Sequence, residues 1–139
     1  MNRMTKFAAV AVAAIALPAI AHHSAVQFDF TKNVQYTGVV KEFAAINPHM
    51  RLIIDVKDGS GTHEVKFEGH STNNMYRNGY RKGMVKVGDT VTVSAAPLRN
   101  GDLGGYVIGV TAGDGTFFGA KPRAGADVGE ETRRQAEGK

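Results

Sequence analysis

The sequence predicts an all-β protein with one short helix, built as a five-stranded barrel of the OB type with an extra N-terminal strand. Three observations predict this fold class. Apolar and polar residues alternate along several segments, turn-forming Gly, Asn, Asp and Pro residues separate these segments, and a single helical stretch lies between the third and fourth barrel strands. This order of strands and helix is typical of OB-type barrels.

Residues 1–21 have the pattern of a secretory signal peptide. Arg3 and Lys6 precede an apolar run over residues 7–17, which is shorter than the roughly 18 to 20 residues that span a bilayer. The small residues of Ala19-Ile20-Ala21 suit a signal peptidase. We therefore expect cleavage after Ala21 and a periplasmic or secreted protein that begins at His22, with no membrane anchor after processing.

The exported part is long enough for one domain of ordinary size. We expect the barrel over residues 22–118 and a disordered C-terminal tail over residues 119–139, which is rich in Gly and mixed charge. Without Arg3 and Lys6 the net charge is close to balance, so charge does not indicate a nucleic acid partner. The chain has no cysteine, which excludes disulfides, thiolate metal ligands and thiol nucleophiles.

The first half of the domain predicts an extended opening piece and three strands. Residues 26–30 alternate, and a turn at residues 31–33 leads into a strand over residues 34–43. Gly38 lies within that strand, where glycine commonly marks a bulge or a bend. The two runs on either side of the turn at residues 58–62 alternate clearly and predict a hairpin.

The second half predicts one helix and two strands. Ser71 is a suitable N-cap for a helix of two or three turns that reaches about residue 82. Alternating residues then predict strands over residues 90–96 and 106–111, and the glycine-rich segment 99–105 predicts the turn between them.

Several short motifs occur together in the exported part. They are "AHHS" at 21–24, "KEF" at 41–43, "NPH" at 47–49, "VGDTVTV" at 87–93 and "PLRNG" at 97–101. In this order they resemble a family of small exported bacterial proteins catalogued as domain of unknown function 6152. The resemblance implies export and a compact β fold, and it brings no settled activity with it.

Hairpin geometry predicts where the histidines lie, because paired residue numbers in an antiparallel hairpin have a constant sum. For the turn near Lys32 this sum is about 64, which places His22 and His23 beside residues 41 and 42, near the "NPH" loop.

The same rule applies to the turn near Ser60. A sum of about 120 places His70 beside Met50, one residue from His49. His63 falls at the opposite end of the hairpin, so we exclude it. Four histidines are therefore expected at one end of the barrel.

Imidazole nitrogens bind Cu, Zn and Ni, and an N-terminal histidine chelates through its amine and its ring together. We therefore predict a metal site, with Cu(II) as the expected ion and Zn(II) as the second candidate, formed by His22, His23, His49 and His70. Another interpretation stays open, in which none of these histidines binds a metal. The adjacent pair is then a spacer at the export junction, His49 is a loop residue, and His70 is a solvated residue at a helix start. Met50 and Met75 lie near the same end and are candidates for additional soft ligands, but both fit inward-facing patterns, which favours a place in the core.

Catalytic patterns are weak in this sequence. Ser24 lacks the context of an activated nucleophile, and the carboxylates of Asp55, Glu64 and Glu68 alternate outward, as on a solvated face. The glycine-rich turns do not precede helices and so do not form phosphate cradles. We interpret the chain as a non-enzyme.

Two functions remain open. The first is an exported metal carrier or buffer whose partners are a metal ion and another exported or membrane protein. The second is a barrel that docks a protein, peptide or oligosaccharide without metal.

Overall fold

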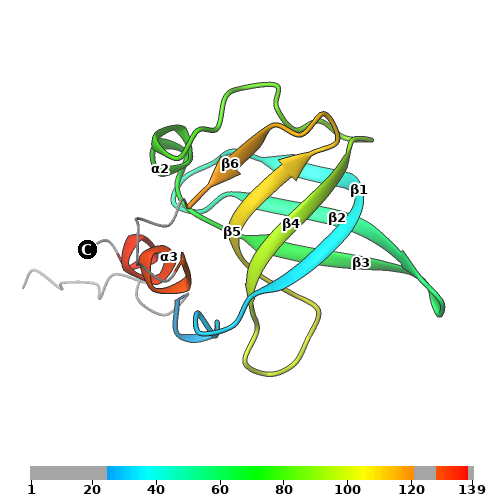
Figure 1. Ribbon diagram of the computed structural model, residues 1–139, viewed down its shortest axis with the longest axis horizontal. Coiled ribbons are helices and arrows are strands. Elements are labelled where there is room, and N and C mark those ends of the chain that lie inside the picture. The colour runs from blue at the N-terminus through cyan, green and yellow to red at the C-terminus, as the bar shows by residue number, and fades with distance from the viewer. Residues whose placement is uncertain (1–24, 121–127, 138–139) are drawn as a thin grey trace, which may run out of the picture.

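The computed structural model describes residues 25–120 and 128–137. Six strands form one sheet in the order β3-β2-β1-β4-β5-β6, and an additional pairing between β3 and β5 closes the first five strands into a barrel (Figure 1). The strands are β1 (Val34–Ala44), β2 (Arg51–Asp58), β3 (Gly61–Glu68), β4 (Thr90–Pro97), β5 (Gly104–Ala112) and β6 (Phe117–Gly119). The predicted class, an OB-like barrel with one extra strand and short helices, is confirmed.

The extra strand follows the five barrel strands in the sequence. β6 pairs with β5, whereas the opening segment makes a single bridge between Phe28 and Leu98. Among the described residues, the opening segment does not pair with β1, whose strand partners are β2 over residues 39–44 and β4 over residues 34–39. The alternation at residues 26–30 has another cause, since Phe28 and Phe30 are both buried while Val26 is exposed. The predicted N-terminal strand is therefore wrong.

The helix between β3 and β4 is shorter than predicted. α2 (Thr72–Arg77) begins after Ser71, whose Oγ accepts a hydrogen bond from the Asn74 N–H at 3.4 Å, as expected for an N-cap. The helix ends at Asn78 because Gly79 adopts a φ of +95°. Residues 80–82 therefore lie outside the helix.

A second helix, α3 (Val128–Ala136), lies in the segment for which the sequence predicted disorder. It lies beside β5 and the opening segment (Figure 1). Thr132 is fully buried, and Gln135 accepts a hydrogen bond from the Asn78 side chain at 3.1 Å. Packing against the barrel thus stabilises a helix that has no strong sequence pattern of its own. No described helix is long and apolar enough to cross a membrane.

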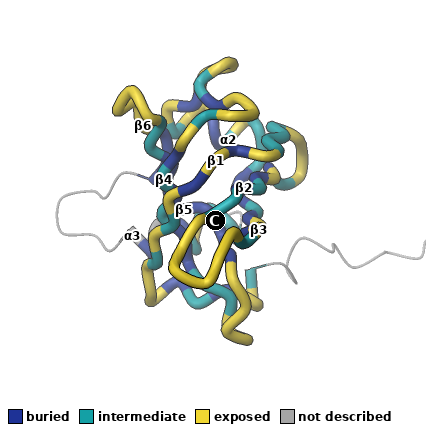
Figure 2. The backbone as a smooth tube through the Cα atoms, turned by 90° about the vertical axis from the view of Figure 1, so that its right-hand side faces the viewer, coloured by how far each residue is buried: buried dark blue, intermediate teal, exposed yellow. Residues whose placement is uncertain are grey.

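Two apolar clusters form the core. The larger fills the barrel and includes Leu52, Ile54, Val93 and Val110, all fully buried. The smaller lies outside the barrel wall, where Phe28 and Phe30 pack edge-on against Tyr106 at centroid distances of 5.4 and 5.5 Å. Figure 2 shows that buried stretches follow the strands while the loops are exposed. The smaller cluster fixes the opening segment against one end of the barrel.

Barrel closure depends on Gly104, which pairs with Lys66 across the parallel β3–β5 contact. Gly104 has a φ of +115°, and a Cβ there would lie 2.1 Å from the Lys66 carbonyl oxygen. We expect Gly104→Ala to lower the free energy of unfolding by about 3 kcal/mol, because backbone strain and steric overlap add. Urea denaturation measures this loss.

Gly59→Ala is the matched control, because no atom lies within 4 Å of a Cβ at that position. Equal stability of the two variants would show that the barrel is not closed at Gly104.

Candidate functional site

The "NPH" loop connects β1 to β2 and is held against the start of α2. The Asn47–Pro48 peptide bond is cis, and Asn47 Oδ1 accepts a hydrogen bond from the Thr72 N–H at 3.0 Å. His49 Nδ1 lies 3.1 Å from the Gly69 carbonyl oxygen. Because a carbonyl only accepts, Nδ1 carries the proton, and Nε2 of the neutral ring keeps its lone pair.

His70 lies next to this loop, as the second hairpin predicted. Arg51 pairs with Glu68, and beyond the strand ends the Met50 N–H donates to the His70 carbonyl at 3.1 Å. His63 pairs with Val56 near the far turn. The structure thus confirms that the chain brings His49 and His70 together and places His63 at the opposite end of the hairpin.

The first hairpin prediction is wrong. The predicted hairpin would pair residues 26–30 with residues 34–38, but within the described residues this part of β1 pairs with β4. The Phe28–Leu98 bridge instead places the opening segment along the connection between β4 and β5. His22 and His23 lie outside the described residues.

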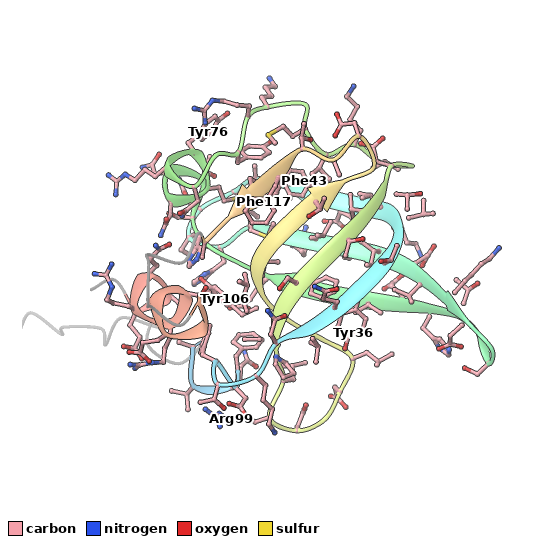
Figure 3. The ribbon with its side chains drawn as sticks, viewed as in Figure 1. Tyr36, Phe43, Tyr76, Arg99, Tyr106 and Phe117 are labelled. Atoms are coloured by element: carbon pink, nitrogen blue, oxygen red, sulfur yellow. The ribbon has the colours of Figure 1, made fainter. Side chains whose placement is uncertain are left out.

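The side chain of His70 is buried, with 7% of its surface exposed. Its Nδ1 lies 3.0 Å from the Tyr106 hydroxyl, and within the described residues its Nε2 has no hydrogen-bond partner. Burial, and to a smaller degree the nearby His49, lower the pKa of His70 to about 4. His70 is therefore neutral at physiological pH. Figure 3 shows Tyr106 at the end of the barrel near α3.

His49 and His70 line different spaces. His49 lines an open groove of about 370 Å³, together with Gln27 and Glu68. Apolar side chains complete the groove wall, namely Phe28, Met50, Phe67 and Leu98. His70 instead lines a small internal cavity of about 20 Å³. The backbones of His49 and His70 are adjacent, but their side chains line different spaces. The two imidazoles therefore do not face one common binding site.

The groove shifts the pKa of Glu68. Burial raises the pKa of Glu68, and the nearby His49 partly offsets that rise. Burial also raises the pKa of Tyr106, and the negative charge of Glu68 adds to the rise. Glu68 thus acts electrostatically on His49 in the groove and on Tyr106, the hydrogen-bond partner of His70.

Two basic side chains on the groove wall form ion pairs with glutamate side chains. Arg51 forms an ion pair with Glu42, and Lys66 lies 3.5 Å from Glu64. These pairs reduce the positive potential at the groove, which favours the approach of a cation.

The sequence did not single out Glu68 or Tyr106 as site residues. Alternation along β3 predicted that Glu68 is solvated, but it is half-buried. It pairs with Tyr106 across the parallel β3–β5 contact. A parallel pairing between strands far apart in the chain leaves no local sequence signal, which is why the pattern missed both residues.

His63 forms a different cluster at the exposed turn between β2 and β3. Its Nε2 lies 2.8 Å from Ser60 Oγ and 3.2 Å from Asp58 Oδ1. Hydrogen bonds from Ser60, and less from His63, lower the pKa of Asp58 to about 2. Both partners use the same ring nitrogen, so Asp58 does not orient the imidazole as in a catalytic triad. The cluster stabilises the turn.

Within residues 25–120 and 128–137, no three His, Cys, Asp or Glu side chains gather closely enough to hold a metal ion. The described part of the predicted metal site is thus His49 in the groove, with Glu68 beside it. The side chain of His70 is buried and does not line this groove.

The model of a family of unknown function, DUF6152, matches residues 9–107. No curated protein matches the chain.

Some solved structures are similar in fold. The mitochondrial single-stranded DNA-binding protein Rim1 of S. cerevisiae is 14% identical with a TM-score of 0.45, over 58% of this chain and 92% of that one. TiaS bound to agmatine, in a ZRD-deleted mutant, is 22% identical with a TM-score of 0.41, over 58% of this chain and 21% of that one. TiaS in complex with a tRNA and ATP has 22% identity and a TM-score of 0.42, over 58% of this chain and 18% of that one. At these scores the similarity carries no functional inference.

The buried His70 predicts a pH dependence of stability. Because its pKa is lower in the folded protein than the ordinary value of 6.5, the unfolded chain binds the extra proton first as the pH falls. Stability should therefore decrease from about pH 6.5 down to about pH 4, by up to about 3 kcal/mol. Urea unfolding of metal-free protein across this range measures the loss.

His70→Gln removes this titration and is the comparison variant. The difference in unfolding free energy between wild type and variant should change with pH over that window. A constant difference from pH 7.5 to pH 4 would contradict a buried neutral His70.

Proposed function

The chain belongs to DUF6152, a family of unknown function, and we propose that it is an exported, non-catalytic metal-binding protein that carries or buffers Cu(II). The single observation that carries this proposal is the state of His49. Its Nδ1 is held by the Gly69 carbonyl, so its Nε2 lone pair is available in an open groove beside Glu68. Metal-binding histidines are commonly oriented in this way by a backbone carbonyl on the other ring nitrogen.

The N-terminus of the processed chain supplies the remaining donors in this proposal. Gln27 lines the same groove as His49. His22 lies five positions before Gln27, and a fully extended chain of that length spans at most about 17 Å. That reach allows the α-amine and the ring of His22, with His23 next to it, to meet His49.

Cu(II) suits this set of donors. An amine and two or three imidazoles provide a tetragonal nitrogen site, and the Irving–Williams order places Cu(II) above Zn(II) for such donors. The half-buried carboxylate of Glu68 offsets part of the positive charge of the ion. Signal-peptide cleavage after Ala21 is part of this proposal, because it creates the α-amine.

Copper titration of the processed protein tests the proposal. We expect one Cu(II) per chain, and binding that weakens at least roughly tenfold in His49→Ala, since one ligand is lost. A glycine added before His22 should weaken it sharply, because the amine leaves its chelating position. Binding should also fade below about pH 6 as the imidazoles become protonated. Isothermal titration against a competing chelator measures these affinities.

His63→Ala is the internal control, because His63 lies at the far turn and contacts Ser60 and Asp58. Its copper affinity should equal that of the wild type. Equal copper binding by the native and glycine-extended chains, or a loss that follows His63 instead of His49, would contradict the metal site.

The groove itself favours the second candidate function. Its apolar wall with a few polar groups at the rim, and its volume of about 370 Å³, suit a small segment of peptide or sugar. Ile46, which is 45% exposed, adds apolar surface there. If copper binding fails the test above, docking of a peptide or oligosaccharide should shift the NMR signals of Gln27 and Leu98 and leave those of Ser60 unchanged.

A further inference from the structure

A pocket on the outer surface of the barrel lies over strands β1, β4, β5 and β6, which are side by side in Figure 1. Its volume is about 250 Å³, and it shares no residue with the groove that contains His49. Its lining residues are Asn33, Gln35, Thr92, Ser94, Ile108, Gly109, Thr111, Phe117 and Ala120. None of these described residues is charged, and the proposed Cu(II) site does not use them.

Strand pairing aligns the side chains of this pocket in rows across the sheet. Ser94 pairs with Gly109 in one row. In the next row Thr92 pairs with Thr111, and Thr111 pairs with Phe117. Residues two positions apart in a strand share one face, so both rows lie on the outer surface of the barrel.

Several polar groups of the pocket can bond to a ligand. Gln35 is exposed on β1 and pairs with Ser94. Ser94 Oγ donates a hydrogen bond to Asn33 Oδ1 at 2.8 Å, which leaves the N–H groups of the Asn33 amide. Within the described part of the chain, no hydrogen bond engages the Gln35 amide or the Thr111 hydroxyl. The pocket therefore offers donors and acceptors that are all uncharged.

Phe117 supplies an apolar surface beside these polar groups. A Cβ added at Gly109 would lie 2.5 Å from Phe117 Cε2, so the ring packs directly on this glycine. The Phe117 side chain is still 41% exposed, and Figure 3 shows it where β6 lies beside β5. One side of the pocket is thus aromatic, and the other carries hydroxyl and amide groups.

The lack of charge in the pocket lining indicates the class of ligand. Nucleic acids and anionic lipids need cations against their phosphates, and no described Lys or Arg lines this pocket. A peptide that extends the sheet needs unpaired backbone groups, but at this place β4 pairs with β1 and β5, and β5 pairs with β4 and β6.

A neutral sugar matches the pocket in charge and in polarity. A pyranose ring has an apolar C–H face, which packs on an aromatic side chain, and hydroxyl groups around its rim, which bond to amides and hydroxyls. The gluco configuration keeps the ring hydroxyl groups at the rim and C–H groups on both faces. This division corresponds to the aromatic and polar sides of the pocket.

We propose that this pocket binds a neutral, gluco-configured oligosaccharide, with one pyranose ring packed on Phe117 and its hydroxyl groups hydrogen-bonded to Asn33 and Gln35. The inference goes beyond the Cu(II) site and does not rest on it. It also assigns a place on the barrel that is separate from the groove.

NMR titration of nitrogen-labelled, metal-free processed protein tests the site, because the side-chain amides of Asn33 and Gln35 give signals of their own. The probes are cellotriose and tri-N-acetylchitotriose, which are neutral and gluco-configured. We expect saturable shifts of both side-chain amides and of the Gly109 backbone N–H with at least one probe, while Gln27 and Ser60 stay unchanged. Absence of shifts with both probes, or shifts centred on Gln27 in the groove, would overturn the proposal.

Triserine is the matched control ligand, because it is a neutral peptide with hydroxyl groups and no sugar ring. It should leave the signals of Asn33, Gln35 and Gly109 unchanged at the concentration that saturates the sugar. Equal shifts with triserine would show general polar contact and would contradict a sugar site.

Variants test the contacts themselves. Phe117→Leu keeps an apolar side chain over Gly109 and removes the aromatic ring, so it should weaken sugar binding about fivefold. Tyr76→Leu is the matched control, because Tyr76 is 40% exposed and lies outside the pocket, and it should bind as the wild type does.

Gln35→Ala provides a second test that spares the apolar packing, because Gln35 is exposed and should be dispensable for folding. It should also weaken binding, since a hydrogen-bonding group is lost. Unchanged affinity in Gln35→Ala and Phe117→Leu, or equal losses in Phe117→Leu and Tyr76→Leu, would reject the pocket as the sugar site.

Discussion

The parallel contact between β3 and β5 is the constraint on which the rest of this structure depends. It brings Lys66, Phe67 and Glu68 beside Gly104, Gly105 and Tyr106 and closes the barrel. Closure requires a residue without a Cβ at Gly104, because a Cβ there would lie 2.1 Å from Lys66 O. Gly105 is needed for the close approach of β4, since a Cβ there would lie 2.2 Å from Ala96 O. Without this contact, Glu68 and Tyr106 would not be neighbours.

The same contact divides the histidine end into two environments. His49 is held by Gly69 on the groove side, while His70 points its Nδ1 at Tyr106 in the interior. The groove is open and holds ionisable groups, and the cavity is closed and holds thioethers. The side chains of His49 and His70 therefore lie in different surroundings, although their backbones are adjacent.

The smaller apolar cluster has a positional role. Phe28, Phe30 and Tyr106 hold the opening segment at the groove, and Ala136 of α3 packs against the same cluster. Arg99, labelled in Figure 3, adds a hydrogen bond from its Nε to the Val26 carbonyl at 3.1 Å. The opening segment is thus fixed in place by aromatic packing and by hydrogen bonds to its backbone.

The sequence alone determined the features that depend on local pattern. Alternation predicted the barrel strands, the turn at residues 58–62 predicted that His70 lies beside Met50, and Ser71 was predicted as an N-cap. The tertiary structure decided the rest. Phe28 and Phe30 do not form a strand because they pack against Tyr106 and bridge Leu98, and α3 depended on a surface to pack against. The pairing of Glu68 with Tyr106 joins residues 38 positions apart, and no local periodicity encodes a contact at that separation.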